Sequence, residues 1–284
     1  MSEYERVVGK PVERIEDLRL VRGRGTYSDD VRAEGQQRRF LDRYLNGIDN
    51  GWEAEPRVRL AIRRADGSAT TRMEHEWPIA RTRWTKLYLD ADRRALGAKA
   101  PQSSAHASYE ALGDGLDFST PPFAAETEYT GPLMARLWIQ SSTMDMDIFA
   151  TLRAFDPAGK ETIFVGASEP VPVTRGWLRA SHRGLDPARS KPWRPWLSHT
   201  CAEKLTPGQT YEVEVEIWPT SIVVPNGWRL VLTLQGRDFE FPGTPGRMLH
   251  NHPQDRPAAA FAGLNTVLTG GSTTSYLLMP EIPA

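Results

Sequence analysis

Residues 210–235 read TYEVEVEIWPTSIVVPNGWRLVLTLQ. From Tyr211 to Ile217 apolar side chains alternate with glutamates, which is the period-two pattern of a strand with one buried face. Pro219 is expected to end this strand because proline cannot donate a hydrogen bond to the ladder, and Pro225-Asn226-Gly227 predicts a turn. A second strand, from Trp228 to Leu234, completes the predicted hairpin. Two such strands need a second sheet over their apolar face, so the stretch predicts an all-β, jelly-roll-like β-sandwich.

The whole chain divides into three parts by its pattern. Residues 1–36 are dense in charge of both signs and predict an arm, and residues 37–50 predict a short helix with a linker. Residues 51–284 alternate short strands with turn signals, as sandwiches do, except that residues 176–200 are too irregular for a strand and predict a long surface excursion. Further strands are predicted at residues 57–63, 82–89, 124–130, 135–141, 147–155, 163–167, 265–269 and 275–279.

The short helix carries an apolar stripe. Phe40, Leu41, Tyr44 and Leu45 are spaced so that they share one helical face. A stripe of this kind needs a cover. The helix is therefore a candidate partner-facing element.

Composition excludes several classes of function. The 284 residues carry a net charge of −1, which gives no electrostatic footprint for nucleic acid or for an anionic membrane. No window reaches the roughly 18 apolar residues of a membrane span, and the charged N-terminus lacks the apolar core of a signal peptide, so the expected location is cytoplasmic. The single cysteine, Cys201, can form neither an intramolecular disulfide nor a zinc cluster and is interpreted as a small buried residue. We expect no metal and no cofactor.

Several sequence motifs occur in the same order as in a known family. They are FLDRYLNGIDNG, GLDFSTPP, GWLRASHRGLDPARSKPW, LTPGQTYEVEVEIWPTS, GWRLVLTLQGRDFE and SYLLMPEIP. In this order they resemble the C-terminal domain of the X-Pro dipeptidyl-peptidase and cocaine esterase family of serine hydrolases, from about residue 37 to the C-terminus. The resemblance implies a jelly-roll domain preceded by a catalytic α/β-hydrolase domain. Residues 7–31 separately resemble the N-terminal segment of molybdenum hydroxylase large subunits, which implies no molybdopterin here.

The same resemblance implies no catalytic residue in this chain, because the family's serine, aspartate and histidine lie in the preceding hydrolase domain. The residues agree with this. A nucleophile elbow needs a serine between close glycines at a strand-to-helix turn. The nearest string, Gly166-Ala167-Ser168-Glu169-Pro170, lacks the second glycine, and its proline prevents the helix.

The irregular stretch is a candidate binding loop. Its aromatic and cationic side chains can stack on flat or sugar-like ligands or on another protein, although packing against a neighbouring domain is the favoured interpretation. The candidate residues are Trp177, Arg179, His182, Arg183, Trp193, Arg194, Trp196 and His199.

Three other groups have the residue types of a site and are interpreted as structural. They are Ser181-His182 and Ser198-His199 with Asp186, His250-Asn251-His252 with Asp255, and Asp145 with Asp147. Sequence neighbours rarely form a catalytic triad, since its members must meet in space with defined orientations. Solvated or backbone-bonded histidines are commoner than metal ligands, and two carboxylates are too few for the six to eight oxygens of calcium.

The sequence thus predicts a non-catalytic β-sandwich module that acts in assembly or in ligand binding, with self-association or an α/β-hydrolase as its partner. The alternative is a hydrolase, either split from its catalytic subunit or with a new site near His182, His199 or His250. A third interpretation is a truncated or fused remnant, joined near residues 32–37.

Overall fold

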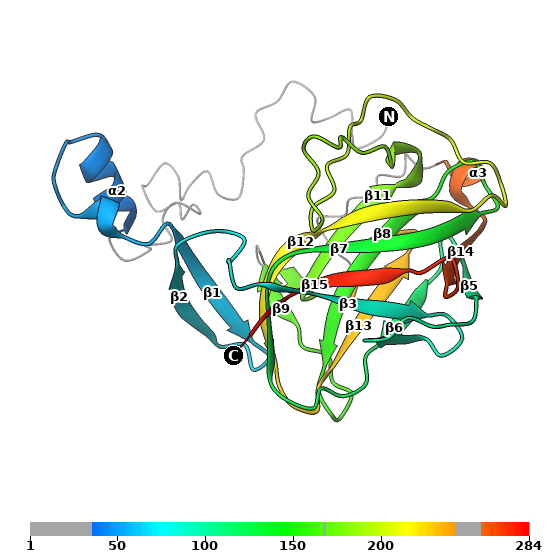
Figure 1. The fold of residues 1–284 in the computed structure, drawn as a ribbon, viewed down its shortest axis with the longest axis horizontal. Helices are drawn as coiled ribbons and strands as arrows, with labels where there is room; N and C mark the ends of the chain where they lie inside the picture. The colour runs from blue at the N-terminus through cyan, green and yellow to red at the C-terminus, as the bar shows by residue number, and fades with distance from the viewer. Residues whose placement is uncertain (1–35, 167–168, 242–256, 284) are drawn as a thin grey trace, which may run out of the picture. The chain divides into compact units, whose positions relative to one another are not determined.

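The computed structural model describes residues 36–166, 169–241 and 257–283 (Figure 1). The chain divides into two compact units, residues 1–55 and residues 56–284. The resemblance of residues 7–31, the string around Ser168 and the histidines of residues 250–252 with Asp255 fall outside the described residues.

The described part of the first unit is a helix with a short return. Helix α2 (Gln36–Tyr44) lies where the apolar stripe predicts a helix. The 3-10 turn η3 (Trp52–Ala54) follows it, and the side chain of Arg39 forms an ion pair with Glu55 beyond the turn.

Strands dominate the second unit, which confirms the all-β prediction. Among the described residues, thirteen strands form one sheet, and β9 and β10 form a small second one. The 3-10 turn η4 (Ala180–His182) and the short helix α3 (Ala258–Phe261) lie between strands. The strands are β1 (Val58–Arg64), β2 (Ala69–Glu74), β3 (Arg83–Asp90), β4 (Ala95–Gly97), β5 (Ala105–Glu110), β6 (Leu116–Ser119), β7 (Thr127–Ser141), β8 (Asp147–Phe155), β9 (Phe164–Gly166), β10 (Glu169–Val171), β11 (Thr174–Arg179), β12 (Tyr211–Val224), β13 (Arg229–Gln235), β14 (Leu264–Thr269) and β15 (Tyr276–Ile282).

The large sheet closes on itself. Its hydrogen-bonded order is β12, β11, β8, β13, β6, β4, β3, β15 and β7, and β7 then pairs with β12, the two strands lying side by side in Figure 1. β1 and β2 branch from β12, while β14 and β5 branch from β7. The ladder is therefore a closed barrel, which alternation in the sequence does not distinguish from two stacked sheets.

Strand β12 is longer than its sequence predicts. The prediction that it ends at Pro219 is wrong, because the strand runs on to Val224. Its register against β7 shifts between Ile217 and Thr220. Such a bulge takes the proline out of the hydrogen-bonded ladder, so that the missing N–H of the proline leaves no ladder hydrogen bond unmade. The bulge also leaves the ring of Trp218 52% exposed.

The predicted hairpin of β12 and β13 is also wrong. β13 pairs with β8 and β6, and β12 pairs with β7, β11 and β1. The turn after Val224 therefore carries the chain across the core instead of folding it back on itself. The apolar faces predicted for the two strands are confirmed, since Val213 and Val215 share one buried cluster with Leu230 and Leu232. Every strand of the closed ring contributes to that cluster.

Candidate functional site

The candidate binding loop begins as a strand. Its first residues, Gly176–Arg179, belong to β11, so the prediction of an irregular excursion is wrong for them. β11 runs antiparallel to β8, with Trp177 opposite Phe149 and Arg179 opposite Asp147. Because side chains alternate along a strand, these four share one face. Ile148 and Leu178, between them, belong to the buried core cluster.

Gly176 explains how β11 fits beside β12. The two strands pair at Gly176 and Ile217. A Cβ atom on Gly176 would lie 2.0 Å from the carbonyl oxygen of Glu216 and 2.7 Å from the Cα atom of Ile217. Only glycine allows this approach of the two backbones.

The chain after β11 forms the walls of a pocket over that face. Turn η4 brings His182 to the pocket, and the return of the loop brings Leu197 and His199. The return is held by the backbone, because the N–H of Ser198 donates to the carbonyl of Gly184 at 2.8 Å. The pocket has a volume of about 400 Å³ and is lined by Asp147, Phe149, Trp177, Leu178, Arg179, His182, Leu197 and His199.

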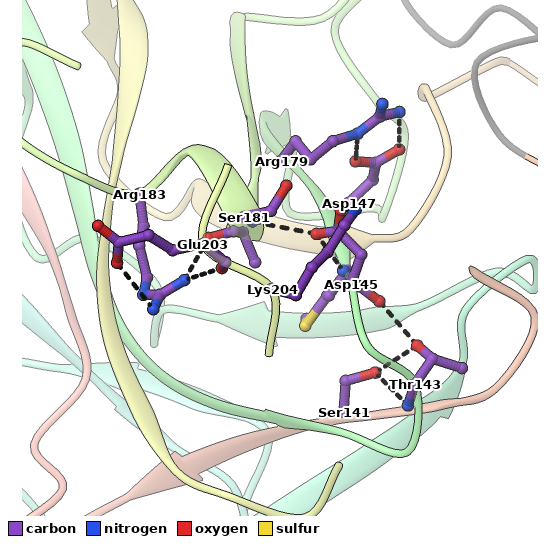
Figure 2. A network of polar contacts seen from close by, with 11 residues as sticks. Ser141, Thr143, Asp145, Asp147, Arg179, Ser181, Arg183, Glu203 and Lys204 are labelled. Carbon is purple, nitrogen blue, oxygen red and sulfur yellow. Dashed lines mark hydrogen bonds and ion pairs between the residues drawn. The ribbon is translucent and has the colours of Figure 1, made fainter. Parts of the chain in front are cut away.

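A buried carboxylate anchors the loop (Figure 2). One oxygen of Asp145 accepts the backbone N–H groups of Met146 and Ser181, each at 3.0 Å, and the other accepts the ammonium of Lys204 at 2.9 Å. Burial alone would raise the pKa of the Asp145 carboxyl, but these hydrogen bonds outweigh it and lower the pKa below its ordinary value. The anchor ties the start of β8 to η4 and to the segment that leads into β12.

A second ion pair forms part of the pocket itself. The guanidinium of Arg179 donates two hydrogen bonds to the carboxylate of Asp147, at 2.8 and 3.1 Å (Figure 2). The carboxylate is 7% exposed. This two-point geometry fixes both side chains and balances their charges.

Two features beside the pocket are unusual. The Nδ1 of His182 is buried and has no hydrogen-bond partner among the described residues. His199 has a φ of 51°, in the left-handed region that residues other than glycine rarely adopt. The rings of His182 and His199 lie 5.5 Å apart, centre to centre. Unused buried polar atoms and a strained backbone are more frequent at functional sites than elsewhere.

The structure brings together four of the eight predicted loop residues, namely Trp177, Arg179, His182 and His199. The other four make contacts of their own. Arg183 donates to the carbonyl and the carboxylate of Glu203, and its guanidinium lies over the ring of Tyr211. Trp193 stacks on Trp84 with ring centres 5.0 Å apart, and Arg194 lies over the ring of Trp196 and pairs with Glu216.

No serine among the described residues forms a hydrogen bond to a histidine. The hydroxyl of Ser198 is hydrogen-bonded to the hydroxyl of Thr200, and the carboxylate of Asp186 accepts a hydrogen bond from the backbone N–H of Ala188. Asp145 and Asp147 are occupied by their cations, and no group of three or more metal-ligating side chains exists in the part of the chain that the structure describes. The expectation that Cys201 is buried is wrong, since it is exposed and free. Within the described residues, no helix is both long and apolar enough to span a membrane.

Comparison with known proteins identifies the domain. The family described as the X-Pro dipeptidyl-peptidase C-terminal non-catalytic domain matches residues 50–278. The chain belongs to this family. The resemblance drawn from the sequence motifs is thereby confirmed, and the matched region is a non-catalytic C-terminal domain of this family.

Three similar proteins are each longer than this chain. A CocE/NonD family hydrolase from Staphylococcus aureus is 27% identical, with a TM-score of 0.76, over 87% of this chain and 45% of that protein. The Mycobacterium bovis protein named "Putative serine esterase" is 26% identical over 76% of this chain and 38% of its own length. Cocaine esterase from Rhodococcus is 22% identical over 88% of this chain and 46% of its own length. The chain thus spans less than half the length of these relatives.

Part of this domain's pocket is not predicted by the sequence. Phe149, Leu178 and Leu197 are not among the predicted residues, and Asp147 is considered only as a calcium ligand. A signal for two of them exists, because Asp147 and Phe149 are two apart in β8, as Trp177 and Arg179 are in β11. Only the register between the two strands brings the pairs together.

Proposed function

We propose that this chain acts as the β module of a CocE/NonD-type serine hydrolase and docks on an α/β-hydrolase catalytic domain. The strongest support is the length of the match, because the aligned region covers 87% of this chain but only 45% of the S. aureus hydrolase. The unmatched part of that hydrolase is where the motif resemblance implies the catalytic residues. The module would then contribute surface and rigidity, and the catalytic domain would contribute the nucleophile.

The stripe on α2 supports docking. Phe40 is 45% exposed, Leu41 47%, Tyr44 59% and Leu45 75%. Three large apolar side chains on α2, together with Leu45 directly after its last residue, are costly to leave in water. A helix of nine residues is also too short to be stable on its own. A partner that covers the stripe would offset both costs.

A jelly-roll arrangement of the strands and a cytoplasmic location belong to the same proposal. The crossing of the chain from β12 to β13 supports the first, because these two strands do not pair but share one buried cluster, as strands in the two layers of a sandwich do. The free, exposed thiol of Cys201 supports the second, because a reducing compartment keeps such a thiol intact.

The experiment mixes this chain with the S. aureus hydrolase shortened to the part that the chain does not match. Sedimentation velocity is expected to show a one-to-one complex. Labelling of the shortened hydrolase with a fluorophosphonate serine probe verifies that it is folded. The double variant Phe40→Ser/Leu45→Ser should weaken the complex at least about tenfold, since each buried apolar side chain stabilises by about 1.5 kcal/mol or more.

The matched control is Val165→Ser, which removes an apolar side chain that is 81% exposed on β9. It should leave the complex unchanged. Absence of a complex with the folded partner would contradict the proposal. Self-association of this chain through Phe40 and Leu45 would contradict it as well and would make a second copy the occupant of the stripe.

A further inference from the structure

We propose that the pocket over β8 and β11 binds one ring of a neutral sugar. This inference is independent of docking on a hydrolase, because it depends on the pocket alone. The pocket joins an apolar side to a polar side. Phe149, Trp177 and Leu197 provide carbon surface, while Asp147, Arg179, His182 and His199 provide polar groups.

The shape and chemistry of the pocket restrict its ligand. A volume of about 400 Å³ lies within the range of small-molecule sites. A molecule that contacts both sides must itself have an apolar face and a polar rim. A pyranose ring has this character, because its C–H groups form a face that packs on aromatic rings and its hydroxyls form the rim.

The charge of the pocket favours a neutral ligand. The two hydrogen bonds between Arg179 and Asp147 hold a cation against an anion at 2.8 and 3.1 Å. An anionic ligand would meet the carboxylate, and a cationic ligand would meet the guanidinium. Either would have to compete with a two-point ion pair, which is costly to break when one member is buried. Hydroxyl groups need not separate the pair to bond to it.

A polar atom of the pocket wall points the same way. His182 lines the pocket, and its Nδ1 has no hydrogen-bond partner among the described residues, although buried polar groups are normally hydrogen-bonded. A hydroxyl both donates and accepts, so it can bond an imidazole nitrogen in either tautomer. His199 lines the pocket although its backbone is in the left-handed region, which glycine adopts more easily than histidine. A binding role accounts for keeping histidine there.

The test is saturation-transfer difference NMR on the whole chain. The probes are the methyl glycosides of glucose, galactose and mannose, the disaccharides maltose and cellobiose, and glucuronic acid as the charged comparison. At least one neutral glycoside is expected to bind saturably and more tightly than glucuronic acid. Failure of every neutral probe to bind, or a preference for glucuronic acid, would overturn the proposal.

Variants locate the binding. Trp177→Ala should weaken the best probe about tenfold, as the loss of one aromatic packing surface does. Trp193→Ala is the matched control, since this tryptophan belongs to the same loop but stacks on Trp84 outside the pocket. Equal weakening by both variants would overturn the assignment of the pocket.

A third variant separates binding from folding. His199→Gly removes the imidazole and relieves the left-handed backbone. It should weaken the best probe at least several-fold while the melting temperature of the protein stays the same or rises. A variant that binds as well as the wild type, or that loses binding only because it is less stable, would refute a direct role for His199.

Discussion

Asp145→Ala tests the anchor of the pocket loop. The substitution leaves two buried backbone N–H groups, those of Met146 and Ser181, without an acceptor. Each such group costs about 1–3 kcal/mol. The loss of the Lys204 ion pair adds less than about 1 kcal/mol, because the lysine side chain is 59% exposed and regains water. The free energy of unfolding should therefore fall by about 2–6 kcal/mol.

Asp145→Asn refines the prediction, since it keeps an oxygen acceptor and removes only the charge. Its cost should be about 1–2 kcal/mol at neutral pH. The pKa of the Asp145 carboxyl is lowered in the folded protein, so its stabilisation is complete above the ordinary aspartate pKa of about 3.9 and is lost as the pH falls through the folded value. The difference between wild type and Asp145→Asn should therefore be constant near neutrality and shrink below about pH 4.

Urea denaturation across this pH range measures both quantities. Asp114→Ala is the matched control, because its fully exposed carboxylate also pairs with a cation, Arg237, at 3.0 Å. It should change stability by less than about 0.5 kcal/mol. The reasoning is refuted if Asp145→Ala costs no more than this control, or if the Asp145→Asn difference persists unchanged in acid.

Two further substitutions test the packing of the barrel. Gly176→Ala should lower the free energy of unfolding in urea by at least about 3 kcal/mol, because its Cβ would lie 2.0 Å from a backbone oxygen. Gly97→Ala is the control, since its Cβ would meet no atom beyond its chain neighbours nearer than 3.9 Å and the substitution should be tolerated. Equal costs for the two variants would contradict the close approach of β11 and β12. Phe118→Ala empties a fully buried position and should cost about 3–5 kcal/mol by the same assay. A cost below about 1 kcal/mol would mean that Phe118 does not pack as the structure shows.

The sequence predicts where the strands of this domain lie better than it predicts which strands pair with each other. Alternation from Tyr211 to Ile217 identifies the buried face of β12, since period two is a local property of the backbone. Whether the turn after Val224 folds the chain back or carries it across the core depends on contacts far away in the sequence. The same limit explains Pro219, because a bulge is set by the partner strand as much as by the proline.

The site shows the same division between local and distant information. Aromatic and charged composition makes residues 176–200 a candidate binding loop, and four of its eight candidate residues line a pocket. Composition does not separate Trp177, which lines it, from Trp193, which stacks elsewhere. That difference follows from the strand register of β11 against β8, and register is fixed by the whole barrel.

The central claim is that this chain is a non-catalytic module, and intact-mass analysis after treatment with a fluorophosphonate probe tests it most directly. The purified chain should keep its unmodified mass, because no serine of the described residues is hydrogen-bonded to a histidine. Of the two serines next to pocket histidines, Ser181 is 1% exposed and Ser198 is hydrogen-bonded to Thr200. The S. aureus hydrolase, treated in parallel, should gain one probe per molecule. Stoichiometric labelling of a single serine in this chain would contradict the claim.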